Sequence, residues 1–102
     1  MKRSRLDYEF YVYIMASISG VLYIGMTNNI FKRVWQHKND KVDGFSKRYK
    51  CHKLVYCEFY QYVYDAINRE KQLKNWTRKK KEFLINKNNS NWNDLARSWY
   101  KF

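Results

Sequence analysis

Residues 10–27 read FYVYIMASISGVLYIGMT, and this stretch decides the fold. Its two runs, FYVYIM and VLYI, are rich in aromatic and β-branched residues, which favour strands, while serine and glycine between them favour a turn. The stretch therefore predicts a β-hairpin with strands over 10–15 and 21–24. Because side chains alternate along a strand, Tyr13 on the first strand and Tyr23 on the second can face the same way.

The residues that follow the hairpin predict a helix, a loop and a third strand. Polar residues at 27–29 are good helix caps, and apolar residues at helical spacing predict a short helix over 30–38. The basic stretch 41–53 contains glycine and serine, which is typical of a mobile loop. LVYCEFY at 54–60 has high strand propensity, so we expect it to join the hairpin in one sheet.

The last third of the chain predicts helices. Residues 63–76 change to a period of 3.6, TRKKKEFLINK at 77–87 begins with a capping threonine, and NWNDLARSWY at 91–100 has apolar residues at helical spacing. The whole pattern predicts an α+β fold in which a three-stranded antiparallel sheet is flanked by helices in the order β-β-α-β-α-α. We expect one domain over 1–102, with a loose basic leader at 1–8 and a helical C-terminal part at 77–102.

Length and charge narrow the classes of function. The chain has 102 residues, enough for one domain, and its 21 Lys and Arg against nine Asp and Glu give a net charge of +12, which favours an anionic partner. No apolar run is long enough for a membrane span, and no secretory leader is recognisable, so we expect a cytoplasmic protein without membrane contact. Its two cysteines are too few for a disulfide framework, and they lack zinc-finger spacing with the two histidines.

Glu70 is the most informative position. On a helical wheel it falls between Ala66 and Ile67, with Leu73 on the other side of Ala66, in the apolar stripe of the helix predicted over 63–76. Because a buried carboxylate is costly unless it is paired, protonated or bound to a metal, Glu70 predicts either an ion pair with a basic side chain or a ligand for a divalent cation.

Two further sets of residues could carry chemistry. Arg33 and His37 are four residues apart on one helix, where the guanidinium could clamp a phosphate and the imidazole could exchange a proton. Tyr13 and Tyr23 could act as a base in a positive pocket. The alternatives are a solvated arginine, a half-buried core histidine and tyrosines that only pack their rings.

Four ordered motifs resemble one family. YVY at 11–13, LYIGMT at 22–27, NIFKRVWQH at 29–37 and INREKQLKNW at 67–76 resemble the GIY-YIG nuclease superfamily. The chain looks most similar to the small, stand-alone, single-domain bacterial branch with the REKQ signature.

The resemblance implies a set of catalytic residues. Tyr13 and Tyr23 match the two motif tyrosines of the family, Arg33 matches the arginine at the scissile phosphate, and His37 matches the His or Tyr one turn later. Glu70 matches the glutamate that binds a single divalent cation, Mg²⁺ or Mn²⁺. The implied reaction is phosphodiester hydrolysis, in which the cation and Arg33 stabilise charge on the phosphate while a tyrosine or His37 takes the proton of water.

The sequence departs from the family pattern in three places. The first motif reads YVY instead of GIY, a common variant that keeps the tyrosine and exchanges the glycine. Met26 and Thr27 stand where several members have a lysine, which removes one cation from the predicted cleft. A family asparagine about a dozen residues after the glutamate has no clear match, because Glu82 occupies that place and Asn86 and Asn88 are displaced. These departures bear on substrate contacts and on turnover.

Two basic runs favour contact with a phosphate backbone. One lies in the predicted loop and one in the helix predicted over 77–87, and such runs neutralise phosphates without reading bases. Trp35, Tyr49 and Trp76 are available to stack on an unpaired base. The residues of the two runs are Lys47, Arg48, Lys50, Lys53, Arg78, Lys79, Lys80 and Lys81.

The favoured hypothesis is a metal-dependent endonuclease that acts on DNA, with RNA left open. We expect it to select branched, flapped or damaged structures, as in DNA repair, because no sequence-reading module is recognisable. The expected partner is nucleic acid, with no small-molecule cofactor and a monomeric or weakly dimeric state. The alternatives are a nucleic-acid-binding protein with this fold but little or no activity, and an assembly module that uses the aromatic C-terminus.

Overall fold

The hairpin predicted over 10–27 forms in the computed structural model, which describes residues 9–100. Strands β1 (Phe10–Ala16) and β2 (Leu22–Thr27) pair antiparallel, and β1 pairs on its other side with β3 (Lys53–Tyr60), also antiparallel. The strand order is therefore β2-β1-β3, with the first strand in the centre. The predicted fold class and element order are confirmed.

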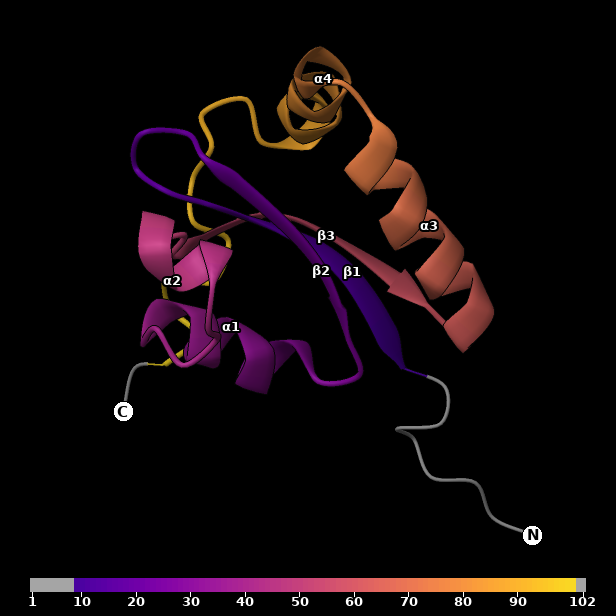
Figure 1. Ribbon diagram of the computed structural model, residues 1–102, viewed down its shortest axis with the longest axis horizontal. Helices are drawn as coiled ribbons and strands as arrows, with labels where there is room; N and C mark the ends of the chain where they lie inside the picture. The colour runs from indigo at the N-terminus through magenta and orange to yellow at the C-terminus, as the bar shows by residue number, and fades with distance from the viewer. Residues whose placement is uncertain (1–8, 101–102) are drawn as a thin grey trace, which may run out of the picture.

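Helices cover both faces of this sheet. Figure 1 shows α1 (Ile30–Lys38) and α2 (Phe45–Tyr49) on one face, and α3 (Val63–Asn75) and α4 (Arg78–Asn88) on the other. Within residues 9–100 the longest helix, α3, has 13 residues, well short of the length that would cross a bilayer. The bounds of α1 are those expected. At its start the side-chain oxygen of Asn29 accepts from the backbone N–H of Lys32. At the start of α4 the side-chain oxygen of Thr77 accepts from the backbone N–H of Lys80.

Alternation along β1 divides the buried side chains into two cores. Val12, Ile14 and Ala16 face α3 and α4, where they pack with residues such as Leu73 and Ile85. Tyr13 and Met15 face the other way and pack with Val34 of α1, Cys51, Leu54 and Ala96. The central strand is thus buried on both faces, and the second core lies beside the buried hydrogen bond between Tyr13 and His37.

The expectation of a mobile loop over 41–53 was wrong in its middle part. Residues 45–49 form α2, which begins after Gly44 at φ 87° and ends before Lys50 at φ 57°. A five-residue helix is too short to show a period in the sequence. It is held instead by a tertiary contact, because the Ser46 side chain is buried against His37.

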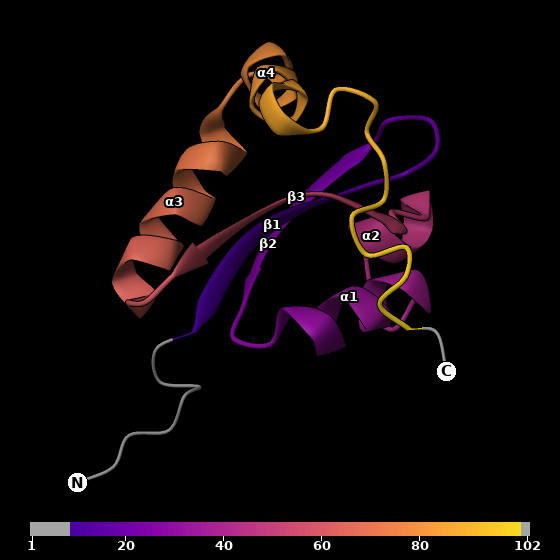
Figure 2. The ribbon, with the colours of Figure 1, turned by 180° about the vertical axis from the view of Figure 1, so that it is seen from behind.

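The expected helix over 91–100 does not form, so the part of the chain after α4 is not helical. Residues 89–100 make turns that run along the start of β3, as the yellow segment in Figure 2 shows. The backbone N–H of Leu95 donates to the carbonyl of Leu54 at 2.8 Å, and a carboxylate oxygen of Asp94 accepts from the Leu54 N–H at 3.0 Å. These bonds satisfy the open edge of β3 at Leu54, and a helix would leave that edge unpaired. The predicted leader at 1–8 lies outside the described residues.

Candidate active site

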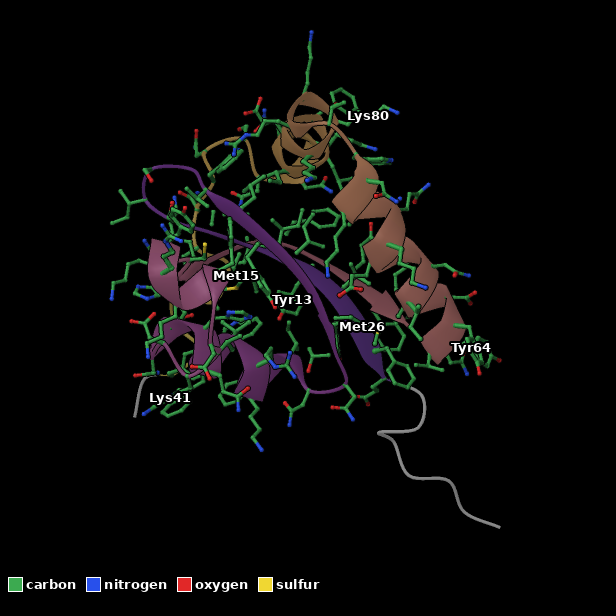
Figure 3. All side chains as sticks on the ribbon, in the orientation of Figure 1. Tyr13, Met15, Met26, Lys41, Tyr64 and Lys80 are labelled. Atoms are coloured by element: carbon green, nitrogen blue, oxygen red, sulfur yellow. The ribbon has the colours of Figure 1, made fainter. Side chains whose placement is uncertain are left out.

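A buried chain of three side chains lies between β1 and the two helices on its polar face. The Tyr13 hydroxyl is 2.7 Å from Nε2 of His37, and Nδ1 of His37 is 2.7 Å from Oγ of Ser46. All three residues are fully or almost fully buried, and Figure 3 shows Tyr13 at the centre of the molecule. Because each imidazole nitrogen has a hydroxyl partner, the ring of His37 is fixed in orientation and can pass a proton along the chain.

The sequence analysis missed Ser46. It lies in the short helix α2, nine residues after His37, and no local pattern connects the two. The only hint was the pair of turn-forming residues in the stretch 41–53, which indicated a break in the chain without indicating what it brings to the site.

The second motif tyrosine completes an aromatic cluster. The ring centroid of Tyr23 lies 4.8 Å from that of His37 and 6.3 Å from that of Tyr13, so the two tyrosines do face the same way. Tyr23 is half-buried, whereas Tyr13 is completely covered. Gly25 lies directly opposite Tyr13 in the β1–β2 register, and a Cβ atom there would sit 2.5 Å from the Tyr13 hydroxyl oxygen. Glycine is therefore needed for the ring to lie flat across β2.

Arg33 and Glu70 both influence the pKa of Tyr13. Burial is the main cause that raises the pKa of Tyr13 well above its usual value, and the neighbouring Tyr23 adds to it. The Arg33 guanidinium opposes this rise in the Tyr13 pKa through hydrogen bonding and charge, while the Glu70 carboxylate reinforces it. Side chains from β2, α1 and α3 thus act on this one phenol of β1, Arg33 by hydrogen bonding and charge, and Tyr23 and Glu70 through charge.

His37 is neutral at physiological pH in this setting. Burial lowers the pKa of His37 from 6.5 to about 4, and its electrostatic interactions with Arg33 and His52 act in the same direction. The neutral ring has one protonated and one bare nitrogen, which is what a donor–acceptor chain between two hydroxyls requires.

This pKa makes stability depend on pH. A group whose pKa is lower in the folded state stabilises the fold fully above its unfolded pKa, here 6.5, and loses that contribution as the pH falls toward about 4. From pH 7 to pH 5 we expect the free energy of unfolding to fall by about 2 kcal/mol more in the wild type than in His37→Gln, measured by urea denaturation. An equal pH dependence in both proteins would show that His37 titrates normally in the fold.

Glu70 is less buried than its position in the sequence indicated. Its side chain is 22% exposed, and Oε2 lies 3.5 Å from Nζ of Lys74 one turn further along α3. The ion-pair interpretation therefore describes part of its environment, since the pair is loose and Lys74 is itself 54% exposed. The carboxylate therefore remains accessible to solvent.

The donor set suits a magnesium ion held by one carboxylate. Residues 9–100 contain no group of three or more His, Cys, Asp or Glu side chains placed to enclose a metal. Mg²⁺ keeps several waters and is commonly bound through one or two carboxylates together with substrate phosphates, so a dedicated protein cage is unnecessary. Glu70, partly exposed beside Tyr13 and Arg33, fits that mode, and a zinc-like closed site does not fit these residues.

The two basic runs lie on opposite faces of the sheet. Lys47 and Arg48 are exposed on α2, while the other run follows α4 on the far side (Figure 1). Several of these cations already have partners: Lys50 with Asp40 at 3.3 Å, Lys53 with the Trp92 carbonyl at 3.2 Å, Arg78 with Glu82 at 2.8 Å, and Lys80 with the Trp76 ring, whose centroid is 5.6 Å away. Lys79 is exposed and Lys81 half-buried on α4.

The positions that depart from the family pattern have structural contacts instead. Met26 packs half-buried against the core on the α3 face, and Glu82 pairs with Arg78. The Asn86 side-chain oxygen accepts from Nε1 of Trp92 at 2.6 Å. Asn86 therefore helps to hold the chain after α4.

Comparisons with known proteins identify a family and relatives for this chain. The model of the GIY-YIG catalytic domain matches residues 9–93. A UPF0213 protein of Bacillus pumilus is 32% identical over 78 residues, which cover 76% of this chain and 80% of the relative, and one of Clostridium perfringens is 39% identical over 75 residues, which cover 74% and 81%.

A solved structure has the same fold. The solution NMR structure of a UPF0213 protein of Bacillus halodurans superposes with a TM-score of 0.56 at 24% sequence identity, over 88% of this chain and 97% of that one.

Proposed function

Because the chain belongs to the GIY-YIG catalytic-domain family, a family of nucleases, we propose that it is a divalent-metal-dependent endonuclease that hydrolyses phosphodiester bonds in DNA. The observation that supports the proposal is the buried hydroxyl of Tyr13, which is hydrogen-bonded to His37 and feels the charges of the Arg33 guanidinium and the Glu70 carboxylate. A phosphate clamp, a proton acceptor and a hard-metal ligand are the parts that phosphodiester hydrolysis needs.

Each residue of the candidate site has a separate role in the proposed hydrolysis. Arg33 binds the non-bridging oxygens of the scissile phosphate, where its fixed charge stabilises the negative charge that develops. The attacking water passes a proton to the Tyr13 oxygen as Tyr13 passes its own to Nε2 of His37, so no free phenolate remains. As the hydroxide bonds to phosphorus, the bond from phosphorus to the leaving oxygen breaks, and that oxygen takes a proton from solvent water. Tyr23 covers His37 and orients the water, and Ser46 holds the imidazole.

The charge of the substrate helps this proton transfer. Arg33 contributes to the low pKa of His37, and a bound phosphate offsets that positive charge. Substrate binding therefore makes the imidazole a better acceptor when it is needed. A Mg²⁺ or Mn²⁺ ion held by Glu70 would supply further charge stabilisation at the phosphate and the leaving oxygen.

The proposal extends to how the substrate is chosen. The basic side chains on α2 and α4 suit phosphate contacts, which fix a nucleic acid in place without reading bases. We therefore propose that DNA structure rather than sequence selects the cleavage site, as in repair. The two thiols, Cys51 and Cys57, are both free, which suits a reducing cytoplasm.

The test is cleavage of plasmid, single-stranded and branched DNA with Mg²⁺ or Mn²⁺, repeated with EDTA. We expect the wild type to cut at least one substrate only with metal, and Arg33→Ala to be about a hundredfold slower or worse, because it loses a fixed charge at the transition state. Arg97→Ala is the matched control, since Arg97 is exposed on the segment after α4.

Each possible outcome points to a different conclusion. Equal cleavage by wild type and Arg33→Ala would contradict the proposal and indicate a contaminating nuclease. Salt-dependent binding with no metal effect and no cleavage would favour the alternative, a nucleic-acid-binding protein with little or no activity.

A further inference from the structure

An aromatic cavity lies at the junction of α3 and α4, apart from the Tyr13 cluster. It has a volume of about 550 Å³ and is lined by Trp76, Thr77, Lys79, Lys80 and Phe83. That volume is within the usual range for small-ligand sites. Its walls are mostly apolar, and its polar groups are side chains of the lysine-rich run of α4.

The two aromatic side chains of this cavity differ in how they are held. Trp76 is half-buried, packs against the core on the α3 face, and carries the Arg69 guanidinium 5.1 Å from its ring centroid. Phe83 is 69% exposed, an unusual environment for phenylalanine, since leaving it exposed forgoes the free energy gained by burial. A fixed ring and an exposed ring therefore share one cavity.

The charged side chains that line the cavity are both positive, those of Lys79 and Lys80. Residues 78–81 of α4 are all Lys or Arg, and the one acidic side chain of this helix, Glu82, is paired with Arg78. Lys80 rests over the Trp76 ring at 5.6 Å from the centroid and is long and exposed enough to move aside. An occupant must therefore combine a flat apolar face for the rings with negative charge for the lysines.

We propose that this cavity binds an unpaired nucleotide of the nucleic-acid substrate, with its base against Trp76 and Phe83 and its phosphate on Lys79 and Lys80. Stacking on aromatic side chains next to a basic track is how proteins hold single strands without reading sequence. A purely acidic peptide would leave the aromatic walls unused, and an apolar ligand would leave the lysines unpaired.

The position along α3 connects this cavity to the candidate active site. Trp76 follows Glu70 by six residues, which is about 9 Å along a helix axis. That is about the rise of three nucleotides in one strand. The inference rests on the proposed function for the class of substrate. It adds that the preferred substrate has an unpaired segment a few nucleotides from the bond that is cut.

The test separates stacking from charge. Binding of a labelled oligothymidylate is measured by fluorescence anisotropy in EDTA and compared with an abasic strand of the same number of phosphates. We expect the wild type to prefer the strand with bases by about fivefold or more, and Phe83→Ala to lose most of that preference with little change in its affinity for the abasic strand.

A matched control is available on the same pair of helices. Tyr64 is 76% exposed on α3, and Figure 3 shows it at the end of that helix away from Lys80. Tyr64→Ala should therefore keep the preference for bases. Lys80→Gln should weaken binding of both strands and lower the salt dependence more than Lys87→Gln does.

Two results would overturn the inference: equal affinity of the wild type for both strands, or equal loss of base preference in Phe83→Ala and Tyr64→Ala. Neither result concerns hydrolysis, which is measured separately with metal on duplex DNA. A wild type that cleaves nothing but prefers bases through Phe83 would keep this site and lose the proposed nuclease activity.

Discussion

Glu70→Gln is expected to slow metal-dependent hydrolysis by about a thousandfold or more. The substitution keeps the shape of the side chain and removes the anionic oxygens that a hard divalent cation requires. Metal-ion stabilisation of a phosphoryl transition state is worth several kcal/mol, and each 1.4 kcal/mol corresponds to about tenfold in rate. Because Glu70 is partly exposed and only loosely paired with Lys74, its loss should leave the fold intact.

Binding should respond in the opposite direction. Removal of Glu70 frees Lys74 and adds one net positive charge near the phosphate, so affinity for DNA in EDTA should stay equal or rise slightly. This combination, a large loss of rate without a loss of binding, separates a metal ligand from a residue that merely holds substrate.

Asp65→Asn is the matched control for this substitution. Asp65 lies on the same helix as Glu70, and its side chain is exposed. Its replacement removes the same charge from another position on α3 and should change the cleavage rate by less than about twofold. Similar rates in Glu70→Gln and Asp65→Asn would contradict the assignment of Glu70.

Gly25→Ala is expected to reduce both stability and activity. A Cβ atom at this position would lie 2.5–3.0 Å from the hydroxyl oxygen and two ring carbons of Tyr13, closer than non-bonded atoms tolerate. Tyr13 is fully buried and hydrogen-bonded to His37, so its ring has nowhere to move without breaking that bond. Overpacking of this kind costs about 1–3 kcal/mol, measured as a shift of the urea midpoint at constant slope.

A double-mutant cycle isolates the cause. In a Tyr13→Val background the ring is absent, so Gly25→Ala should cost much less stability than it does in the wild type. If the cost is the same in both backgrounds, the effect comes from the backbone of β2 and not from the contact with Tyr13. Activity in Gly25→Ala should fall even where the protein remains folded, because Tyr13 and His37 no longer share a hydrogen bond.

The family match and most of the elements were predictable because they depend on local patterns. The change from period two in the hairpin to period 3.6 in α3 marks where strands give way to helices, and Asn29 and Thr77 mark helix starts through short-range hydrogen bonds. The prediction that Tyr13 and Tyr23 face the same way also succeeded, since strand alternation and hairpin pairing require it.

In the C-terminal segment, hydrogen bonds to a distant strand outweigh the local helical pattern of the sequence. The apolar spacing in residues 91–100 is compatible with a short helix, but a helix of fewer than three turns gains little stability by itself. The open edge of β3 offers hydrogen bonds to Asp94 and Leu95 that a helix would forgo. A segment forty residues away in sequence therefore decided its conformation.

The sequence by itself determined the sheet, the three longer helices, the excess of positive charge and the family. Each of these depends on composition or on patterns among residues that are close together along the chain. Only the tertiary structure decided that Ser46 holds His37, that Gly25 must lack a side chain for Tyr13 to fit, that the two basic runs lie on opposite faces, and that Trp76 and Phe83 share a cavity. The physical reason is that close packing and the completion of buried hydrogen bonds act between side chains that meet only after the chain has folded.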